Sequence, residues 1–153
     1  MKVIVLATGF NVTKNFPFPE NLKVFVDGKE YIANQHFIYN SCMISELPNT
    51  MFVFGYPQFT LTFKSTLVSK YFCKLIEHLK SIKKNSFVVD PPQTNLEDVP
   101  PKNLFFSFNC NYMNRTQEYY PKQTSGLYGF SNLPLVDYYR FNFASYKKEM
   151  HFK

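Results

Sequence analysis

Residues 65–84 read STLVSKYFCKLIEHLKSIKK, and this stretch carries the clearest helical pattern in the chain. Its apolar side chains recur at spacings of three and four, which is the repeat of one face of an α-helix. They are Leu67, Val68, Tyr71, Phe72, Leu75, Ile76, Leu79 and Ile82. Because Ser65 is a suitable N-cap, we predict one main amphipathic helix over residues 66–83.

Two β-hairpins are predicted before this helix. The runs at residues 22–26 and 29–33 flank Asp27-Gly28, a pair that favours a type I′ turn because both central positions need positive φ. Residues 51–54 and 59–63 flank Gly55-Tyr56-Pro57-Gln58, and the second run alternates apolar and polar side chains as a half-buried strand does.

The rest of the chain is interpreted segment by segment. We expect a first strand at residues 2–8, not a signal peptide, and a short helix at about residues 40–47. Residues 88–103 are rich in proline and form an extended connector, and residues 114–126 form a long exposed loop. Strands are expected at residues 104–113 and 136–145, followed by a basic, aromatic tail at residues 146–153.

The predicted fold class is therefore α+β, with residues 1–153 in a single domain. An antiparallel sheet of at least two hairpins packs on the main helix, and a proline-rich connector leads to a β-rich C-terminal part. Runs of strands followed by one helix, without regular βαβ alternation, favour this class.

The composition is rich in aromatic residues and lysine. Phe and Tyr supply 29 of the 153 residues, which is more ring surface than one small core needs, so some rings should lie at an interface. Lys outnumbers Arg by 15 to 2, and Asn reaches 14, a pattern typical of an AT-rich genome such as that of a virus or a parasite. Genome composition therefore accounts for part of the aromatic excess.

The net charge of +6 favours anionic partners, with a solvated lysine surface as the plain alternative. At the end of the main helix the lysines can equally stabilise the helix dipole. The residues that we predict for nucleic-acid binding are Lys80, Lys83, Lys84, Arg115, Arg140, Tyr146, Lys147, Lys148 and Lys153.

No catalytic, metal or cofactor motif stands out in the sequence. Cys42, Cys73 and Cys110 are widely separated and lack a CxxC pair, so we expect buried thiols in the cytoplasm or another reducing compartment. No run approaches the roughly 18 apolar residues that span a bilayer. We therefore expect a non-enzymatic protein with no metal, no cofactor and no membrane span.

Two functional hypotheses follow from these observations. The first is a basic binding protein that docks on RNA or a ribonucleoprotein such as a ribosome. The second is a protein-interaction or structural subunit, for example of a viral particle or a host-targeting complex, which contacts other protein subunits through exposed aromatic and proline-rich segments. The rings predicted for that interaction are Phe16, Phe18, Tyr119, Tyr120 and Phe152.

Overall fold

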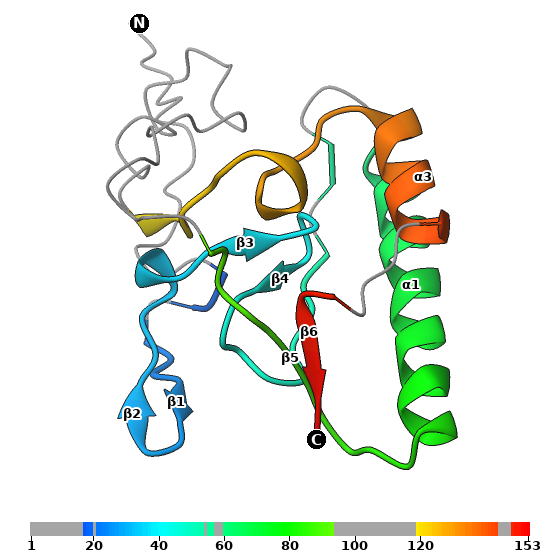
Figure 1. Ribbon diagram of the computed structural model, residues 1–153. Coiled ribbons are helices and arrows are strands. Elements are labelled where there is room, and N and C mark those ends of the chain that lie inside the picture. Colours follow the sequence, from blue (N-terminus) through cyan, green and yellow to red (C-terminus); the bar gives the residue numbers. More distant parts are fainter. Residues whose placement is uncertain (1–16, 20, 54, 57–59, 94–118, 144–147) are drawn as a thin grey trace, which may run out of the picture.

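The computed structural model describes residues 17–19, 21–53, 55–56, 60–93, 119–143 and 148–153. Within these ranges it contains two α-helices and several short antiparallel sheets, so the α+β class is confirmed at this level (Figure 1). The strands form three separate two-stranded sheets there, where the sequence predicts one sheet. The predicted strands at residues 2–8 and 104–113 lie outside the described residues, as do residues 94–103 of the connector.

The first hairpin turns at Asp27-Gly28, as predicted. Strands β1 (Phe25–Val26) and β2 (Lys29–Glu30) pair antiparallel, with Val26 opposite Lys29. The two turn residues have φ values of 50° and 79°, the positive values that a type I′ turn requires. A 3₁₀ turn, η1 (Ala33–Gln35), follows the hairpin.

A second hairpin replaces the helix predicted at residues 40–47. Strands β3 (Ile38–Tyr39) and β4 (Met43–Ile44) pair antiparallel, with Tyr39 opposite Met43. The turn between them has φ values of 48° at Asn40 and 56° at Ser41. Two consecutive residues in the left-handed region reverse the chain and cannot continue a right-handed helix, so the helix prediction is wrong.

The main helix is present but starts earlier than predicted. Helix α1 runs from Leu61 to Ser81, so the predicted strand at residues 59–63 is wrong over residues 61–63. Thr60 is its N-cap, whereas Ser65 lies inside the helix and donates its hydroxyl to the Leu61 carbonyl at 2.9 Å. The alternation at residues 59–63 misled the prediction because the first turn of α1 is exposed and needs no buried stripe.

The C-terminal part differs most from the prediction. Helix α3 (Pro134–Phe143) lies where a strand was expected at residues 136–145. Residues 150–152 of the predicted tail form strand β6 (Met150–Phe152), which pairs antiparallel with β5 (Phe87–Val89). The start of the predicted connector is therefore strand, and the described C-terminal part contains a helix as well as β-structure.

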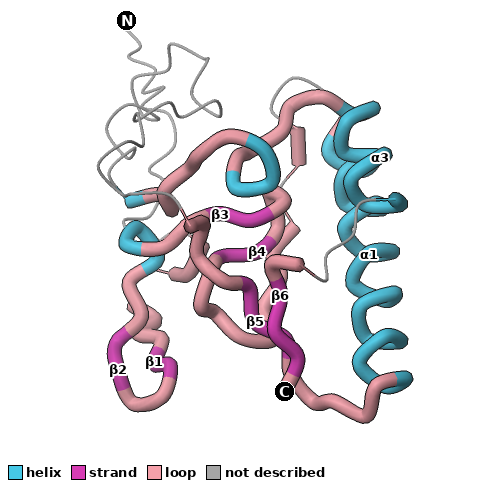
Figure 2. The backbone as a smooth tube through the Cα atoms, viewed as in Figure 1, coloured by secondary structure: helices cyan, strands magenta, loops and turns pink. Residues whose placement is uncertain are grey.

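The described core has two parts, separated by the β3–β4 hairpin. Tyr39 and Met43 pack with the buried face of α1, with β5 and with Phe141 of α3. Ile38 and Ile44 point the other way and pack in a second cluster that includes Tyr31, Ala33, Leu47 and Phe130. Successive residues of a strand alternate between faces, so the hairpin is buried on both sides. Figure 2 shows these short strands between long loops, with α1 and α3 together at one side.

The two helices run side by side in the same direction (Figure 1). Tyr71 of α1 meets the edge of Phe141 of α3 at 5.3 Å between ring centroids, and Lys74 donates to the Asn142 side chain at 3.2 Å. No helix among the described residues is long and apolar enough to cross a membrane.

Candidate functional site

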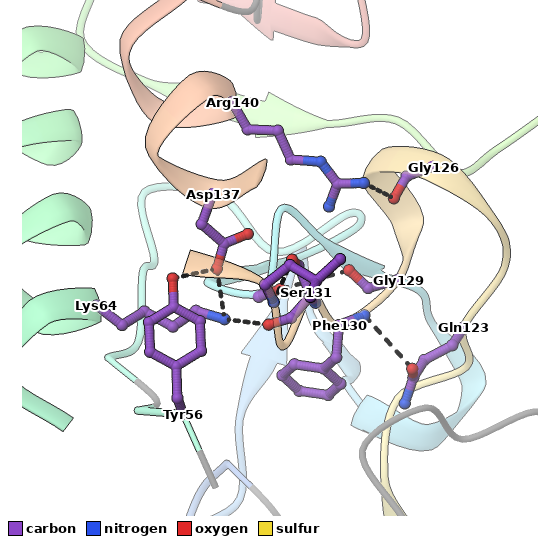
Figure 3. A network of polar contacts seen from close by, with 11 residues as sticks. Tyr56, Lys64, Gln123, Gly126, Gly129, Phe130, Ser131, Asp137 and Arg140 are labelled. Carbon is purple, nitrogen blue, oxygen red and sulfur yellow. Dashed lines mark hydrogen bonds and ion pairs between the residues drawn. The ribbon is translucent and has the colours of Figure 1, made fainter. Parts of the chain in front are cut away.

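A buried ion pair joins the two helices. Lys64 of α1 and Asp137 of α3 are each 1% exposed, and Lys64 Nζ lies 3.2 Å from Asp137 Oδ2 (Figure 3). The Tyr56 hydroxyl donates to the same carboxylate oxygen at 2.7 Å, and Lys64 also donates to the Ser131 carbonyl at 3.0 Å. Three segments of chain thus converge on one carboxylate.

Helical spacing places both charges inside. Lys64 lies three, four and seven residues before Leu67, Val68 and Tyr71, on the buried stripe of α1. Asp137 is in the first turn of α3, four residues before buried Phe141, where the positive end of the helix dipole favours a carboxylate.

The loop that carries Ser131 is held by backbone-directed hydrogen bonds. Ser41 Oγ accepts from the Ser131 amide at 3.0 Å and donates to the Gly129 carbonyl at 3.4 Å. Gln123 accepts from the Phe130 amide at 3.4 Å, and Arg140 donates to the Gly126 carbonyl at 3.0 Å (Figure 3). The turn of the β3–β4 hairpin, this loop and α3 therefore form one connected unit.

The electrostatics of the ion pair favour anchoring over catalysis. Burial lowers the pKa of the Lys64 ammonium, and the Asp137 charge partly opposes this. Burial, followed by the hydrogen bond to Asp137, raises the pKa of Tyr56. Burial also raises the pKa of the Cys42 thiol, so this thiol stays protonated and unreactive. Lys64, Asp137 and Tyr56, the groups of this ion-pair site that could transfer a proton, are buried and paired with one another.

Two buried acceptors have no hydrogen-bond partner among the described residues. They are Asn40 Oδ1 and Asp137 Oδ1. Each carboxylate or amide oxygen can accept up to two hydrogen bonds, so the site has capacity for a further donor. The described part of the chain contains no group of three or more His, Cys, Asp or Glu residues that could hold a metal ion.

A second polar cluster lies beside the other core. The rings of Tyr31 and His36 stack at 4.1 Å, and His36 Nδ1 lies 2.9 Å from Glu46 Oε2. The Tyr31 hydroxyl donates to the Ser45 carbonyl at 2.7 Å. Burial raises the pKa of Tyr31, and the Glu46 charge adds to the effect. This cluster ties the segment after β2 to the segment after β4.

Six of the nine residues that we predicted for nucleic-acid binding lie among the described residues. Lys80, Lys83 and Lys84 are exposed at the end of α1. There the Lys83 amide bonds to the Lys80 carbonyl at 3.2 Å and the Lys84 amide to the Leu79 carbonyl at 3.0 Å, which is the Schellman pattern of a helix end. The backbone amides of Lys83 and Lys84 thus complete the C-terminus of α1.

The other three described residues of this set are Lys153, Arg140 and Lys148. The Lys153 amide bonds to the Ser86 carbonyl at 2.9 Å, close in sequence to the end of α1, whereas Arg140 lies on α3. Lys148 is exposed before β6. Arg115, Tyr146 and Lys147 lie outside the described residues.

The described rings that we predicted for protein contact pack within the molecule. Phe18 packs against the second core cluster, and Phe152 meets the edge of His78 at 5.1 Å. Tyr119 is half-buried and Tyr120 is buried, so the end of the predicted exposed loop is partly interior. Phe16 lies outside the described residues.

The prediction of buried thiols is correct for Cys42 and wrong for Cys73, which is exposed on α1. Cys73 follows buried Tyr71 by two residues, so it points to the side of the helix away from the core. Cys110 lies outside the described residues.

Sequence reasoning missed the ion pair because its members are 73 positions apart. Lys64 lies between the predicted strand at residues 59–63 and the predicted helix at residues 66–83, and Asp137 lies at the start of the predicted strand at residues 136–145. One local signal was available for each residue. Lys64 continues the apolar stripe of α1 by one turn towards the N-terminus, and Pro134 is typical of the first position of a helix that would contain Asp137.

Comparison with known proteins gives a consistent set of similar sequences. The chain is 28% identical over 123 residues to "Putative FAD-containing monooxygenase MymA" of Mycobacterium tuberculosis, which is 80% of this chain and 23% of that protein. It is 28% identical over 123 residues to "FAD-containing monooxygenase EthA" of the same species, covering 24% of that protein. It is also 27% identical over 126 residues to "Probable FAD-binding monooxygenase AlmA" of an Acinetobacter species, covering 79% of this chain and 23% of AlmA.

The chain thus spans about a quarter of the length of the curated relatives it matches. No family model matches the chain. No solved structure matches it either.

These relatives contradict the predicted function. Their names are those of FAD-containing monooxygenases, which are enzymes. They do not support a non-enzymatic protein that binds RNA or a ribonucleoprotein, nor a viral structural subunit. The prediction rested on net charge and aromatic content, which describe a surface but not an active site. The names of these relatives also contradict the expectation that the protein is not an enzyme.

Proposed function

We propose that this chain forms one segment of an FAD-containing monooxygenase and that other segments of the enzyme hold the flavin. The observation that carries the proposal is the match of about four fifths of this chain to a quarter of proteins with that name. A segment of this kind contributes to the fold and the surroundings of the active centre without containing the whole of it.

The sequence lacks the motif that usually holds the FAD pyrophosphate. Dinucleotide cofactors are commonly bound at a G-x-G-x-x-G turn, where backbone amides at a helix N-terminus face the phosphates. The five glycines of this chain stand at positions 9, 28, 55, 126 and 129, and no three of them have that spacing.

The described glycines serve other purposes. Gly28 forms the β1–β2 turn, and a Cβ at Gly55 would collide with Leu61 at the start of α1. A Cβ at Gly129 would lie 2.7 Å from the Thr124 carbonyl oxygen, so this glycine allows two stretches of its own loop to approach. Helix α3 begins at Pro134 and also lacks a glycine-rich turn. The described residues of this chain therefore do not form a main binding site for FAD.

The buried network supports a scaffolding role for the segment. Lys64, Asp137 and Tyr56 join α1, α3 and the chain before α1 through charge-assisted contacts in the buried interior. Such a unit holds its elements in fixed positions, which an active centre built from several segments needs.

A domain-replacement experiment tests the proposal. The 153-residue chain replaces the matched region of M. tuberculosis MymA, and the chimera is purified beside MymA that lacks this region. We expect the chimera to retain flavin absorbance after gel filtration and the deletion protein to lose it. We expect the 153-residue chain alone, mixed with FAD, to elute without flavin.

Two results would refute the proposal. One is a soluble chimera that holds no FAD, because the chain then does not substitute for the matched region. The other is stoichiometric FAD binding by the isolated chain, because the flavin site would then lie within this segment.

We also propose that the protein works in a reducing compartment. Cys42 and Cys73 are both free thiols among the described residues, and exposed Cys73 would be prone to oxidation elsewhere.

A further inference from the structure

Helix α3 is apolar on both of its sides. Asp137 and Phe141, four residues apart, face the core and α1. Leu135, Tyr139 and Phe143 are also four residues apart and lie on the opposite side, with exposures of 84%, 65% and 67%. We call these three residues, together with the adjacent Tyr138, the outer face of α3.

The rings of the outer face gather into one patch. Tyr139 and Phe143 lie 5.6 Å apart between ring centroids, and Tyr138 and Phe143 lie 6.4 Å apart. Figure 1 shows α3 at the margin of the described part, with α1 packed against it. A contiguous exposed apolar patch commonly marks an interaction site.

The outer face carries no charge. The two charged residues of α3 are Asp137, which is buried with Lys64, and Arg140, which bonds to the Gly126 carbonyl. Nucleic acid would need cations at the contact, and a membrane-surface helix is typically flanked by several lysines or arginines on its polar side. The chemistry of the patch fits an apolar protein surface.

We propose that the outer face of α3 docks onto the part of the monooxygenase that this chain does not match. This inference rests on the proposed function. The matches cover 23% or 24% of each relative, so more than three quarters of such an enzyme lies beyond the matched region. That remainder is large enough to bury a helix face of this size.

Hydroxyl-radical footprinting of the MymA chimera described above tests this docking. Oxidation rates of Tyr139 and Phe143 are measured by peptide mass spectrometry in the chimera and in the isolated 153-residue chain. In the isolated chain these two side chains are 65% and 67% exposed, and docking should bury them as in the core of an interface. We therefore expect their oxidation to be roughly fivefold slower in the chimera. Tyr71 is 2% exposed and should stay unoxidised in both proteins, which shows that both are folded.

The outcomes separate this inference from the proposed function. A chimera without FAD refutes the proposed function. A chimera that holds FAD but oxidises Tyr139 and Phe143 as fast as the isolated chain refutes the docking alone.

Two other occupants are tested on the isolated chain. If it is a dimer by light scattering and the two rings become reactive only on dilution, the face binds a second copy and the docking is refuted. If vesicles of anionic phospholipid protect the two rings in the isolated chain, and the rings are not protected in the chimera, the face contacts a membrane. That result also refutes the docking.

Discussion

Replacement of Lys64 by methionine tests the central ion pair. Lys64→Met keeps an unbranched side chain of similar length and removes the ammonium that lies 3.2 Å from Asp137 Oδ2. Among the described residues, Asp137 is then a buried carboxylate with one remaining side-chain donor, the Tyr56 hydroxyl at 2.7 Å. The prediction is a large loss of stability from a single change that leaves the core volume almost intact.

The expected magnitude follows from the burial of both partners. Removing one member of a buried pair costs about 3–5 kcal/mol, because the other charge remains without compensation. The retained Tyr56 bond and the helix N-terminus, worth about 0.3–1 kcal/mol, offset part of this cost. We therefore expect the free energy of unfolding to fall by about 3 kcal/mol, a large part of the roughly 5–15 kcal/mol of an ordinary domain.

The measurement is urea denaturation at neutral pH, followed by far-UV circular dichroism. The matched control is Lys70→Met at an exposed position of α1, which should change the free energy of unfolding by less than about 0.5 kcal/mol. Replacing the whole site with apolar residues, as Lys64→Met, Asp137→Leu and Tyr56→Phe together, should restore stability to within about 2 kcal/mol of wild type. A loss below about 1 kcal/mol in Lys64→Met, or a triple variant less stable than this single one, would contradict the reasoning.

Three further predictions concern the helix end, a buried tyrosine and the thiols. Lys83 has a φ of 54°, so Lys83→Gly should raise the free energy of unfolding by about 0.5–1 kcal/mol in urea titrations, whereas Lys84→Gly should not. Burial raises the pKa of Tyr56 above its ordinary 10.0, so the folded protein keeps a proton that the unfolded chain releases above pH 10. The stability that Tyr56 contributes is therefore present below pH 10 and is lost as the pH rises further. The urea midpoint should fall less steeply above pH 10 in Tyr56→Phe than in the wild-type protein. In native protein, maleimide should label Cys73 well before buried Cys42, and equal rates by peptide mapping would contradict the burial.

Local patterns were sufficient where one short-range interaction decides the structure. The Asp27-Gly28 turn needs only the backbone freedom of its own residues, and the hairpin forms there. The stripe from Leu67 to Leu79 also predicted the existence of α1, though not its start, because a helix closes its hydrogen bonds within itself.

Residues 134–143 show why the C-terminal part could not be predicted in the same way. Tyr139, Phe141 and Phe143 fit a strand at a spacing of two, and Tyr139 and Phe143 fit a helix at a spacing of four. The helix is observed, with Asp137 and Phe141 against α1 and Tyr139 and Phe143 outside. Contact with a distant segment thus selected between two local patterns of similar quality.

The candidate site also combines features visible in the sequence with features that only the folded chain shows. The residue types of Lys64 and Asp137 are plain in the chain, but nothing local indicates that they meet across 73 positions. The functional class that we propose rests on similarity to longer proteins named FAD-containing monooxygenases, because the sequence itself has no cofactor motif that composition could reveal.

The sequence alone determined the α+β class, the Asp27-Gly28 hairpin and the existence of α1, because each depends on interactions among residues near in sequence. Tertiary contacts decided the β3–β4 hairpin, the helical state of residues 134–143 and the pairing of β5 with β6. They also decided which charges are buried. The physical reason is that burying Lys64 is favourable only when Asp137, Tyr56 and the Ser131 carbonyl arrive together, and only the folded chain brings them to one place.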